Sequence, residues 1–196
     1  MVPVYKIGLS VNEINHVALE KSGLKFYRVV PREKILTLAP TFLGVPYKFG
    51  SSVLKDSPNS FDCSSFTAYL YVEAGIAIPR ICNDQYKFGV SVSDEEAMPG
   101  DLVFFKSNRT DIGPDVVGHV GLYIGDGEMI HAGGFSMGYG KVTQEKIVES
   151  KYYLTGFMGY KKFILDGSER FIIEIPDEKL DLRNKENLIK YIEKYN

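Results

Sequence analysis

The chain has 196 residues, of which 44% are hydrophobic and 24% are charged, proportions typical of a globular domain. Its 23 basic and 25 acidic residues give a net charge of −2, which argues against nucleic acid or an anionic membrane as a partner. Two cysteines are too few for a disulfide-stapled scaffold, and no apolar run predicts a transmembrane segment. No signal peptide is visible, so we expect either a cytoplasmic protein or a mature exported form. The oligomeric state is not indicated.

The first half of the chain predicts helices separated by loops. Apolar residues recur at helical spacing from residue 32 to 43, and Pro40 predicts a break there because proline lacks the N–H that a helix needs. In chain order we expect extended pieces over residues 1–30, this broken helix, a polar loop over 50–61, a helix from Asp62-Cys63 to Gly75, and a helical turn over 84–86.

After residue 100 the pattern changes to strands. Apolar and β-branched runs predict strands over 102–105, 119–124, 128–132 and 153–165, an edge strand over 171–175, and a polar helix over 184–195. Residues 125–127 read as the tight turn of a hairpin between the second and third strands. Helices followed by strands indicate an α+β fold.

Cys63 stands where a polar loop enters a predicted helix. The positive end of a helix dipole favours a thiolate, the form of cysteine that acts as a nucleophile. The polar neighbours Asp62 and Ser64 are unusual beside a cysteine that only fills a core. A buried structural cysteine is the alternative interpretation.

Two of the three histidines, His119 and His131, lie at the two ends of the predicted hairpin. In an antiparallel hairpin these ends are neighbours, so a base beside the thiol and a second group orienting that base become possible. Two alternatives stay open. Both rings could bond to backbone at the hairpin edge, or they could bind zinc together with Cys63.

Six stretches, in order, carry a resemblance to a known family. They are Gly44–Gly50, Phe61–Phe66, Ile78–Arg80 with Asp84–Tyr86, Met98–Phe105, Gly118–Gly125 and Met129–Ala132. In this order, with one Cys and two His at the matching places, the chain resembles the NlpC-type cell-wall peptidases, a papain-like cysteine peptidase family. The chain departs from the family at Ser65, where relatives usually have Gly.

The resemblance implies a papain-like core in which helices pack on a central antiparallel β-sheet. It implies Cys63 as nucleophile, His119 as base and His131 as the orienting third member, with no metal or cofactor. It also implies that Tyr47 lies beside the nucleophile and helps hold the oxyanion. Asp62 and Ser64 match positions that bind the substrate's amino end. Packing by Tyr47 and helix capping by Asp62 and Ser64 are the structural alternatives.

The resemblance covers roughly residues 32–163. We therefore expect a catalytic domain over 31–165, an N-terminal extension over 1–30, and a C-terminal strand and helix extension over 166–196. The implied function is a cysteine peptidase that hydrolyses cell-wall peptides at the bond between γ-D-glutamate and the following diamino acid. Two alternatives are an amidase or acyltransferase of the same fold acting on a lipid or other amide, and a non-catalytic binding module.

Overall fold

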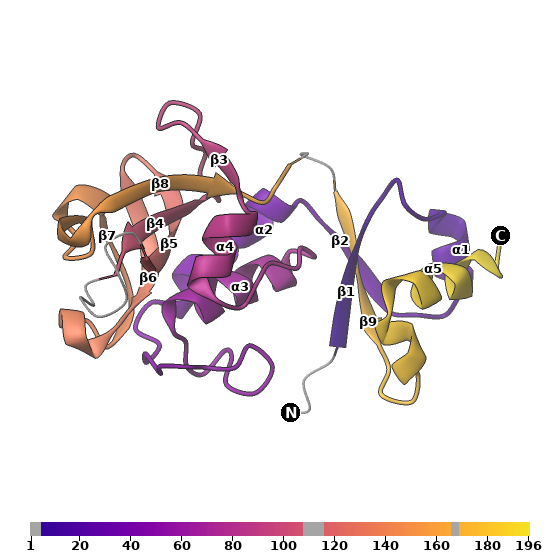
Figure 1. Cartoon of the computed structure of the whole chain (residues 1–196). Coiled ribbons are helices and arrows are strands. Elements are labelled where there is room, and N and C mark those ends of the chain that lie inside the picture. The colour runs from indigo at the N-terminus through magenta and orange to yellow at the C-terminus, as the bar shows by residue number, and fades with distance from the viewer. Residues whose placement is uncertain (1–4, 108–115, 166–168) are drawn as a thin grey trace.

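The computed structural model describes residues 5–107, 116–165 and 169–196, which form a larger and a smaller unit side by side (Figure 1). The larger unit contains a six-stranded sheet in the order β3-β8-β4-β5-β6-β7, in which every pairing is antiparallel. Its strands are β3 (Val90–Val92), β4 (Leu102–Lys106), β5 (Val117–Gly125), β6 (Glu128–Gly133), β7 (Lys141–Lys146) and β8 (Phe157–Lys162).

Helices cover one face of this sheet. They are α2 (Pro31–Leu38), the short 3-10 helix η1 (Ala39–Phe42), α3 (Cys63–Glu73) and α4 (Cys82–Phe88). The predicted break at Pro40 is confirmed, because the α-helix ends at Leu38 and Pro40 opens the tighter 3-10 turn. Gly75, with φ 77°, follows the end of α3, as predicted. The arrangement confirms the α+β class.

Both faces of the sheet are buried, which explains the continuous apolar run in β4. Leu102 and Phe104 point toward the helices, whereas Val103 and Phe105 point to the opposite face, because side chains alternate along a strand. The outer cluster is covered by the segment after β7, which contains the 3-10 helices η3 (Ile147–Glu149) and η4 (Tyr153–Thr155). A further short helix, η2 (Phe135–Met137), follows β6.

Strands β5 and β6 form the predicted hairpin. Leu122 pairs with Ile130 and Tyr123 with Met129, and the turn between the strands contains Asp126 in the left-handed region at φ 52°. His119 and His131 therefore lie on neighbouring strands, away from the turn.

The smaller unit is built from both ends of the chain. Its three strands are β1 (Tyr5–Ser10), β9 (Arg170–Ile175) and β2 (Phe26–Val29), and its helices are α1 (His16–Lys21), η5 (Leu180–Arg183) and α5 (Lys185–Glu193). The sheet order is β1-β9-β2 with antiparallel pairing throughout. The prediction of an edge strand over 171–175 is wrong. β9 lies in the middle because both of its partners come from the distant N-terminal segment.

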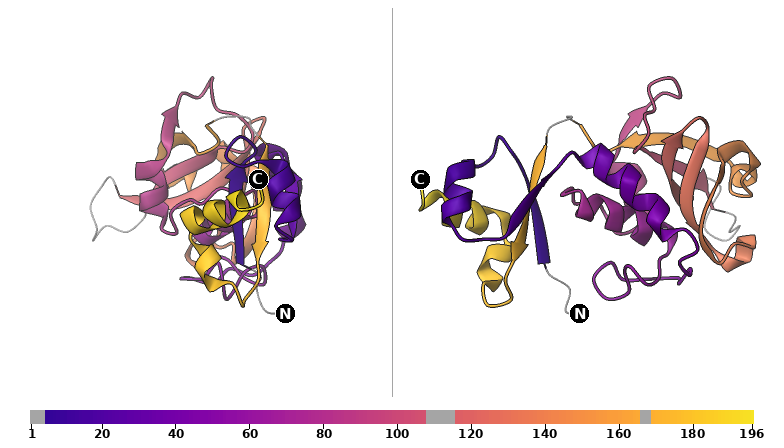
Figure 2. Two further views of the ribbon diagram at one scale, coloured as in Figure 1. Left: turned by 90° about the vertical axis from the view of Figure 1, so that its right-hand side faces the viewer. Right: turned by 180° about the vertical axis from the view of Figure 1, so that it is seen from behind.

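The smaller unit has its own apolar core and packs against the larger one. Phe171, Ile173 and Leu188 are buried in this core together with residues of α1. At the joint Lys6 forms an ion pair with Glu73 of α3 at 2.8 Å. The view from behind shows the two units beside each other, with the first and the last described strands, β1 and β9, both in the smaller one (Figure 2). The expected extensions thus share one sheet, although residues 1–4 and 166–168 lie outside the described part.

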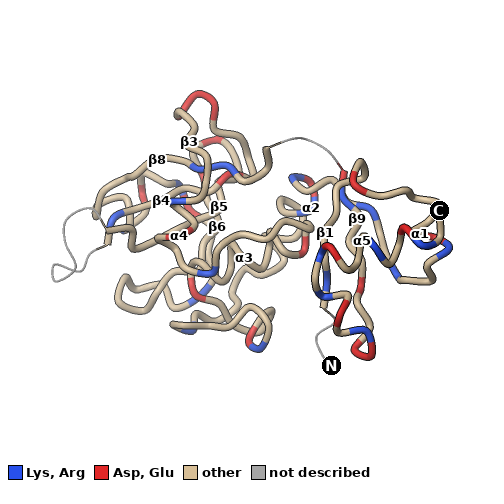
Figure 3. Tube along the Cα trace, turned by 45° about the vertical axis from the view of Figure 1, so that its right-hand side comes forward, with Lys and Arg blue, Asp and Glu red and all other residues tan. Residues whose placement is uncertain are grey.

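Residues of both charge signs occur in each unit. In the described part of the chain, lysine and arginine lie near aspartate and glutamate in both units (Figure 3). Within the described ranges no helix combines the length and the apolar character needed to cross a bilayer.

Candidate active site

Cys63 is the first residue of α3, and a capping box makes the helix begin there. Asp62 accepts a hydrogen bond from the Ser65 backbone N–H at 2.7 Å, and the Ser65 hydroxyl accepts one from the Asp62 N–H at 2.8 Å. Ser65, the departure from the family pattern, is therefore half of this cap. The predicted helix start and the capping role of Asp62 are both present.

Asp62 and Ser64 are also held by Arg80. The guanidinium donates to the free carboxylate oxygen of Asp62, to the Ser64 hydroxyl at 2.9 Å, and to the carbonyl of Ser51. Gln85 of α4 donates to the carbonyl of Ser64 at 3.0 Å. These contacts tie the loop before α3 and the start of α4 to the helix that carries Cys63.

The sulfur of Cys63 is surrounded by hydrogen-bond donors. A hydrogen bond from the Cys82 thiol lowers the pKa of Cys63, as do the backbone N–H groups of Val120 and Ser64, while burial and the charge of Asp62 act in the opposite direction. Burial and the neighbouring Cys63 raise the pKa of Cys82 instead. Both cysteines are free thiols. The arrangement favours a thiolate at Cys63 and a thiol at Cys82.

His119 lies almost fully buried between two partners. Its Nε2 is 2.9 Å from Nδ1 of His131, and its ring stacks on Tyr152 with ring centroids 3.4 Å apart. Burial, together with the neighbouring His131, lowers the pKa of His119 well below its usual range. This ring is therefore neutral near pH 7, the state of a general base.

Cys63 and His119 share neighbours. The backbone N–H of Val120, the residue after His119, helps to lower the pKa of Cys63. Burial raises the pKa of Tyr152, the ring stacked on His119, to about 12, and the charge of Cys63 contributes to this shift. Among the described contacts no hydrogen bond joins the sulfur directly to the His119 ring, so that contact stays a prediction.

His131 is completely buried, and its second ring nitrogen contacts a residue that the sequence did not indicate. Nε2 lies 2.8 Å from Oε1 of Glu145 in β7. The rings of both histidines therefore bond to side chains, whereas the hairpin-edge alternative expected them to bond to the backbone. The described residues contain no group of three or more potential ligands arranged to hold a metal, so the zinc alternative has no geometric support among them.

Tyr47 is half-buried and lies close enough to Cys63 for the charge of Cys63 to affect its pKa. Its N–H donates to the carbonyl of Gly140 at 2.9 Å, and the next N–H donates to the carbonyl of Phe61, two residues before Cys63. Burial raises the pKa of Tyr47, and the charge of Cys63 adds to the shift. The ring of Tyr47 packs edge-on against Phe135, whose side chain is 72% exposed, at the rim of the site.

Four residues near the site were not predicted from the sequence: Cys82, Tyr139, Glu145 and Tyr152. Cys82 had a signal, because it follows the Ile78–Arg80 stretch that resembles the family. Glu145 had none, because only the pairing of β7 with β6 brings it near His131. Thr143 is paired with His131 across the sheet, and Glu145 lies two residues further on the same face.

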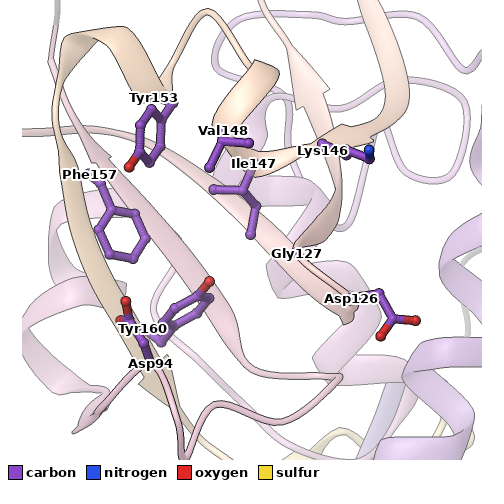
Figure 4. Close-up of a pocket in the computed structure, with 9 residues that line it drawn as sticks. All are labelled: Asp94, Asp126, Gly127, Lys146, Ile147, Val148, Tyr153, Phe157 and Tyr160. Carbon is purple, nitrogen blue, oxygen red and sulfur yellow. The ribbon is translucent and has the colours of Figure 1, made fainter.

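A separate pocket of about 330 Å³ lies on the outer side of the sheet (Figure 4). It is lined by the turn residues Asp126 and Gly127 and by the aromatic rings of Tyr153, Phe157 and Tyr160, among others. None of the six site residues expected from the sequence lines it.

The comparison with known proteins agrees with the family resemblance seen in the sequence. A sequence model of the NlpC/P60 family matches residues 44–159, more than half of the chain, and this range includes Cys63, His119 and His131. The chain belongs to the NlpC/P60 family. The resemblance found in the sequence is thereby confirmed.

Two relatives illustrate the range of named activities in the family. A probable endopeptidase p60 of Listeria seeligeri is 43% identical over 98 residues, which cover 50% of this chain and 17% of that protein. The γ-DL-glutamyl hydrolase of Bacillus subtilis strain 168 is 35% identical over 140 residues, which cover 68% of this chain and 30% of that protein. The chain thus spans less than a third of either relative.

A solved NlpC/P60 family protein from Bacillus cereus ATCC 10987 has the same fold. The two structures superpose with a TM-score of 0.57 at 33% identity, covering 67% of this chain and 40% of the other. The papain-like α+β architecture expected from the resemblance is confirmed.

Proposed function

We propose that the protein is a cysteine peptidase that hydrolyses peptidoglycan-type peptides, at the bond between γ-linked D-glutamate and the following diamino acid. The observation that carries the proposal is the environment of Cys63. Its sulfur lies at a helix N-terminus, among hydrogen-bond donors that favour the thiolate. One of these donors is the backbone N–H of Val120, the residue after His119, and the His119 ring is hydrogen-bonded to His131. The relatives named as hydrolases and endopeptidases support the same class of reaction.

The reaction is an acyl transfer in two halves. Cys63 attacks the γ-carbonyl carbon of D-glutamate, and its proton moves to His119. Since Nε2 of His119 is engaged with His131, Nδ1 is the ring atom that takes this proton. The oxyanion forms beside the backbone N–H of Cys63 and the hydroxyl of Tyr47.

The first half ends when the C–N bond breaks and His119 returns the proton to the leaving amine. The product left on the enzyme is a thioester of Cys63. Water then attacks the thioester with His119 as base, which releases the D-glutamyl γ-carboxylate and restores the thiol. Asp62, close to the nucleophile, is the group proposed to attract the substrate's ammonium end, although Arg80 and the helix cap already engage both of its oxygens.

A binding module without catalysis is the rival proposal. A protein that only binds wall peptides has no chemical need for a cysteine of lowered pKa together with two histidines hydrogen-bonded to each other. The intact set Cys63, His119 and His131 therefore favours an enzyme.

The test is digestion of a free tetrapeptide L-Ala-γ-D-Glu-diamino acid-D-Ala, with the fragments identified by mass spectrometry. The wild-type protein should release L-Ala-D-Glu. Cys63→Ala and His119→Ala should lower kcat/KM by roughly 10³-fold or more, and His131→Ala should lower it less, because the third residue makes no bond.

His16→Ala is the matched control, since His16 lies in the smaller unit with its side chain about half exposed. It should leave kcat/KM unchanged. Cleavage at another bond would revise the substrate, whereas full turnover by Cys63→Ala would end the cysteine mechanism. The N-acetylated peptide, run in parallel, tests whether a free amino end is required.

A further inference from the structure

Glu145 of β7 lies directly behind the two histidines. Oε1 of its carboxylate is 2.8 Å from Nε2 of His131, and Oε2 accepts a hydrogen bond from the Tyr139 hydroxyl at 3.1 Å. The Glu145 side chain is 20% exposed, and that of His131 is fully buried. The three groups Glu145, His131 and His119 thus follow one another in hydrogen-bond contact, from β7 through β6 to β5.

The carboxylate of Glu145 is ionised at neutral pH and can only accept hydrogen bonds. Burial alone would raise its pKa, but hydrogen bonds from His131, Tyr139 and Ser150 outweigh burial and hold the pKa below its usual range. An ionised carboxylate has no proton to donate. The proton between Glu145 and His131 must therefore lie on Nε2 of His131.

When both rings are neutral, this requirement determines the proton positions on both. A neutral His131 with its proton on Nε2 has a lone pair on Nδ1, so Nδ1 accepts a hydrogen bond. Its partner at 2.9 Å, Nε2 of His119, must then carry a proton. A neutral His119 with its proton on Nε2 keeps its lone pair on Nδ1, and Nδ1 is the atom that takes the proton of Cys63 in the proposed reaction.

The opposite arrangement would disable the base. If His131 carried its proton on Nδ1, it would donate to Nε2 of His119, and the proton of a neutral His119 would lie on Nδ1. His119 could then accept nothing from Cys63. In water the two tautomers of histidine differ little in energy, so a buried acceptor on one side suffices to select one.

We propose that Glu145 is a positioning residue that selects the Nε2–H tautomer of both histidines and stabilises the positive charge that His119 acquires when it takes the thiol proton. Its part in turnover rests on the proposed peptidase function, but the tautomer assignment does not. A purely structural role, in which Glu145 only ties β7 to Tyr139, predicts no change at the imidazole rings.

Three variants separate these roles. Glu145→Gln keeps an oxygen that can accept from His131 but removes the charge, whereas Glu145→Ala removes both. Glu149→Gln is the matched control, because this glutamate lies nearby on the chain, is 68% exposed, and pairs with Lys146 at 3.8 Å. Thermal unfolding of each variant identifies any that fails to fold, and the near-isosteric Glu145→Gln then carries the test.

The first readout is the ¹⁵N NMR spectrum of histidine-labelled protein, in which the shifts of Nδ1 and Nε2 report the tautomer of each ring. Wild type, Glu149→Gln and Glu145→Gln should show the Nε2–H form at His119 and His131. Glu145→Ala should show a mixture, with His16 as an internal reference. Wild-type tautomers in Glu145→Ala would overturn the proposal.

The second readout is kinetic. The kcat/KM on the tetrapeptide should fall by roughly 10²-fold or more in Glu145→Ala and by roughly tenfold in Glu145→Gln, the range found when a group that orients a catalytic or ligating histidine is removed. Glu149→Gln should match wild type. Wild-type kcat/KM in Glu145→Gln would refute the charge-stabilising part. If wild type cleaves no wall peptide, the proposed function fails while the NMR result still decides the tautomer assignment.

Discussion

Cys63, the proposed nucleophile, shows how far the surroundings of a residue could be predicted from its neighbours in sequence. The helix start is encoded locally, since Asp62 and Ser65 form the cap. The start and the capping by Asp62 were predicted from the sequence, whereas the second capping residue was expected at Ser64 and is Ser65. The other donors to the sulfur come from distant segments, Cys82 of α4 and Val120 of β5. They could not be predicted, because their approach depends on how α4 and the sheet pack against α3.

The thiol of Cys82 provides a prediction at this scale. Its hydrogen bond lowers the pKa of Cys63, so the thiolate persists to lower pH with Cys82 than without it. In Cys82→Ala the midpoint of the pH profile for alkylation of Cys63 by iodoacetamide should move to higher pH. Below that midpoint the rate should fall roughly tenfold, since a hydrogen bond to a charged group contributes about 1.5 kcal/mol. Peptide mapping after timed alkylation measures the rate.

Cys82→Ser is the control, because its hydroxyl keeps a donor at this position. Its profile should lie between those of the wild type and the alanine variant. In the wild-type protein Cys63 should be alkylated well before Cys82, whose pKa burial raises. Superimposable profiles for all three proteins would show that the second thiol does not stabilise the first.

Some helices and strands could be predicted from their own sequence, whereas others form by pairing with another strand. The helix α3 and the strands β4, β5 and β6 were predicted because each has its own apolar pattern. β7 was not, since its sequence contains a single apolar residue, Val142, and becomes a strand by pairing with β6. Glu145 belongs to this strand, so its approach to His131 could not be predicted from local pattern.

The cap of α3 yields a prediction at the scale of an element. Asp62→Ala removes the acceptor for the Ser65 N–H and leaves Arg80 without its carboxylate. The free energy of unfolding should fall by about 1–2 kcal/mol, the usual cost of losing a helix cap. Asp62→Asn keeps a capping oxygen and should stay within about 0.5 kcal/mol of wild type. Urea unfolding at pH 7 measures both.

Asn184→Ala is a matched comparison for the cap. Asn184 caps α5 in the smaller unit by accepting from two backbone N–H groups. Its loss should cost a similar free energy while the alkylation rate of Cys63 stays at the wild-type value. In Asp62→Asn that rate should instead rise at low pH, since the charge of Asp62 raises the pKa of Cys63. Equal stabilities of Asp62→Ala and wild type would show that the cap contributes little.

At the scale of the whole molecule, the candidate site lies in one unit, and the segments from the two ends of the chain pair in the other. Cys63, His119, His131 and Glu145 all belong to the larger unit, and the smaller unit has its own core around Phe171. The pairing of β9 with β1 and β2 was not predictable, because each strand alone is short and its partners are far away in sequence. The sequence therefore indicated several elements of the larger unit, whereas the pairing in the smaller unit could not be read from it.

The joint between the units depends on Gly8 of β1, which packs against the backbone of Gly75 after α3. A Cβ atom at Gly8 would lie 2.0 Å from the Gly75 carbonyl oxygen, and backbone cannot move aside as a flexible side chain can. Gly8→Ala should therefore lower the free energy of unfolding by about 3 kcal/mol or more, the upper part of the range for overpacking. Gly23→Ala, at φ 71° with open space around it, should cost only about 1 kcal/mol of backbone strain. Below the unfolding transition both variants should retain wild-type kcat/KM, because the site lies in the other unit. If the free energy of unfolding in urea were no lower for Gly8→Ala than for Gly23→Ala, the two units would not meet closely at this strand.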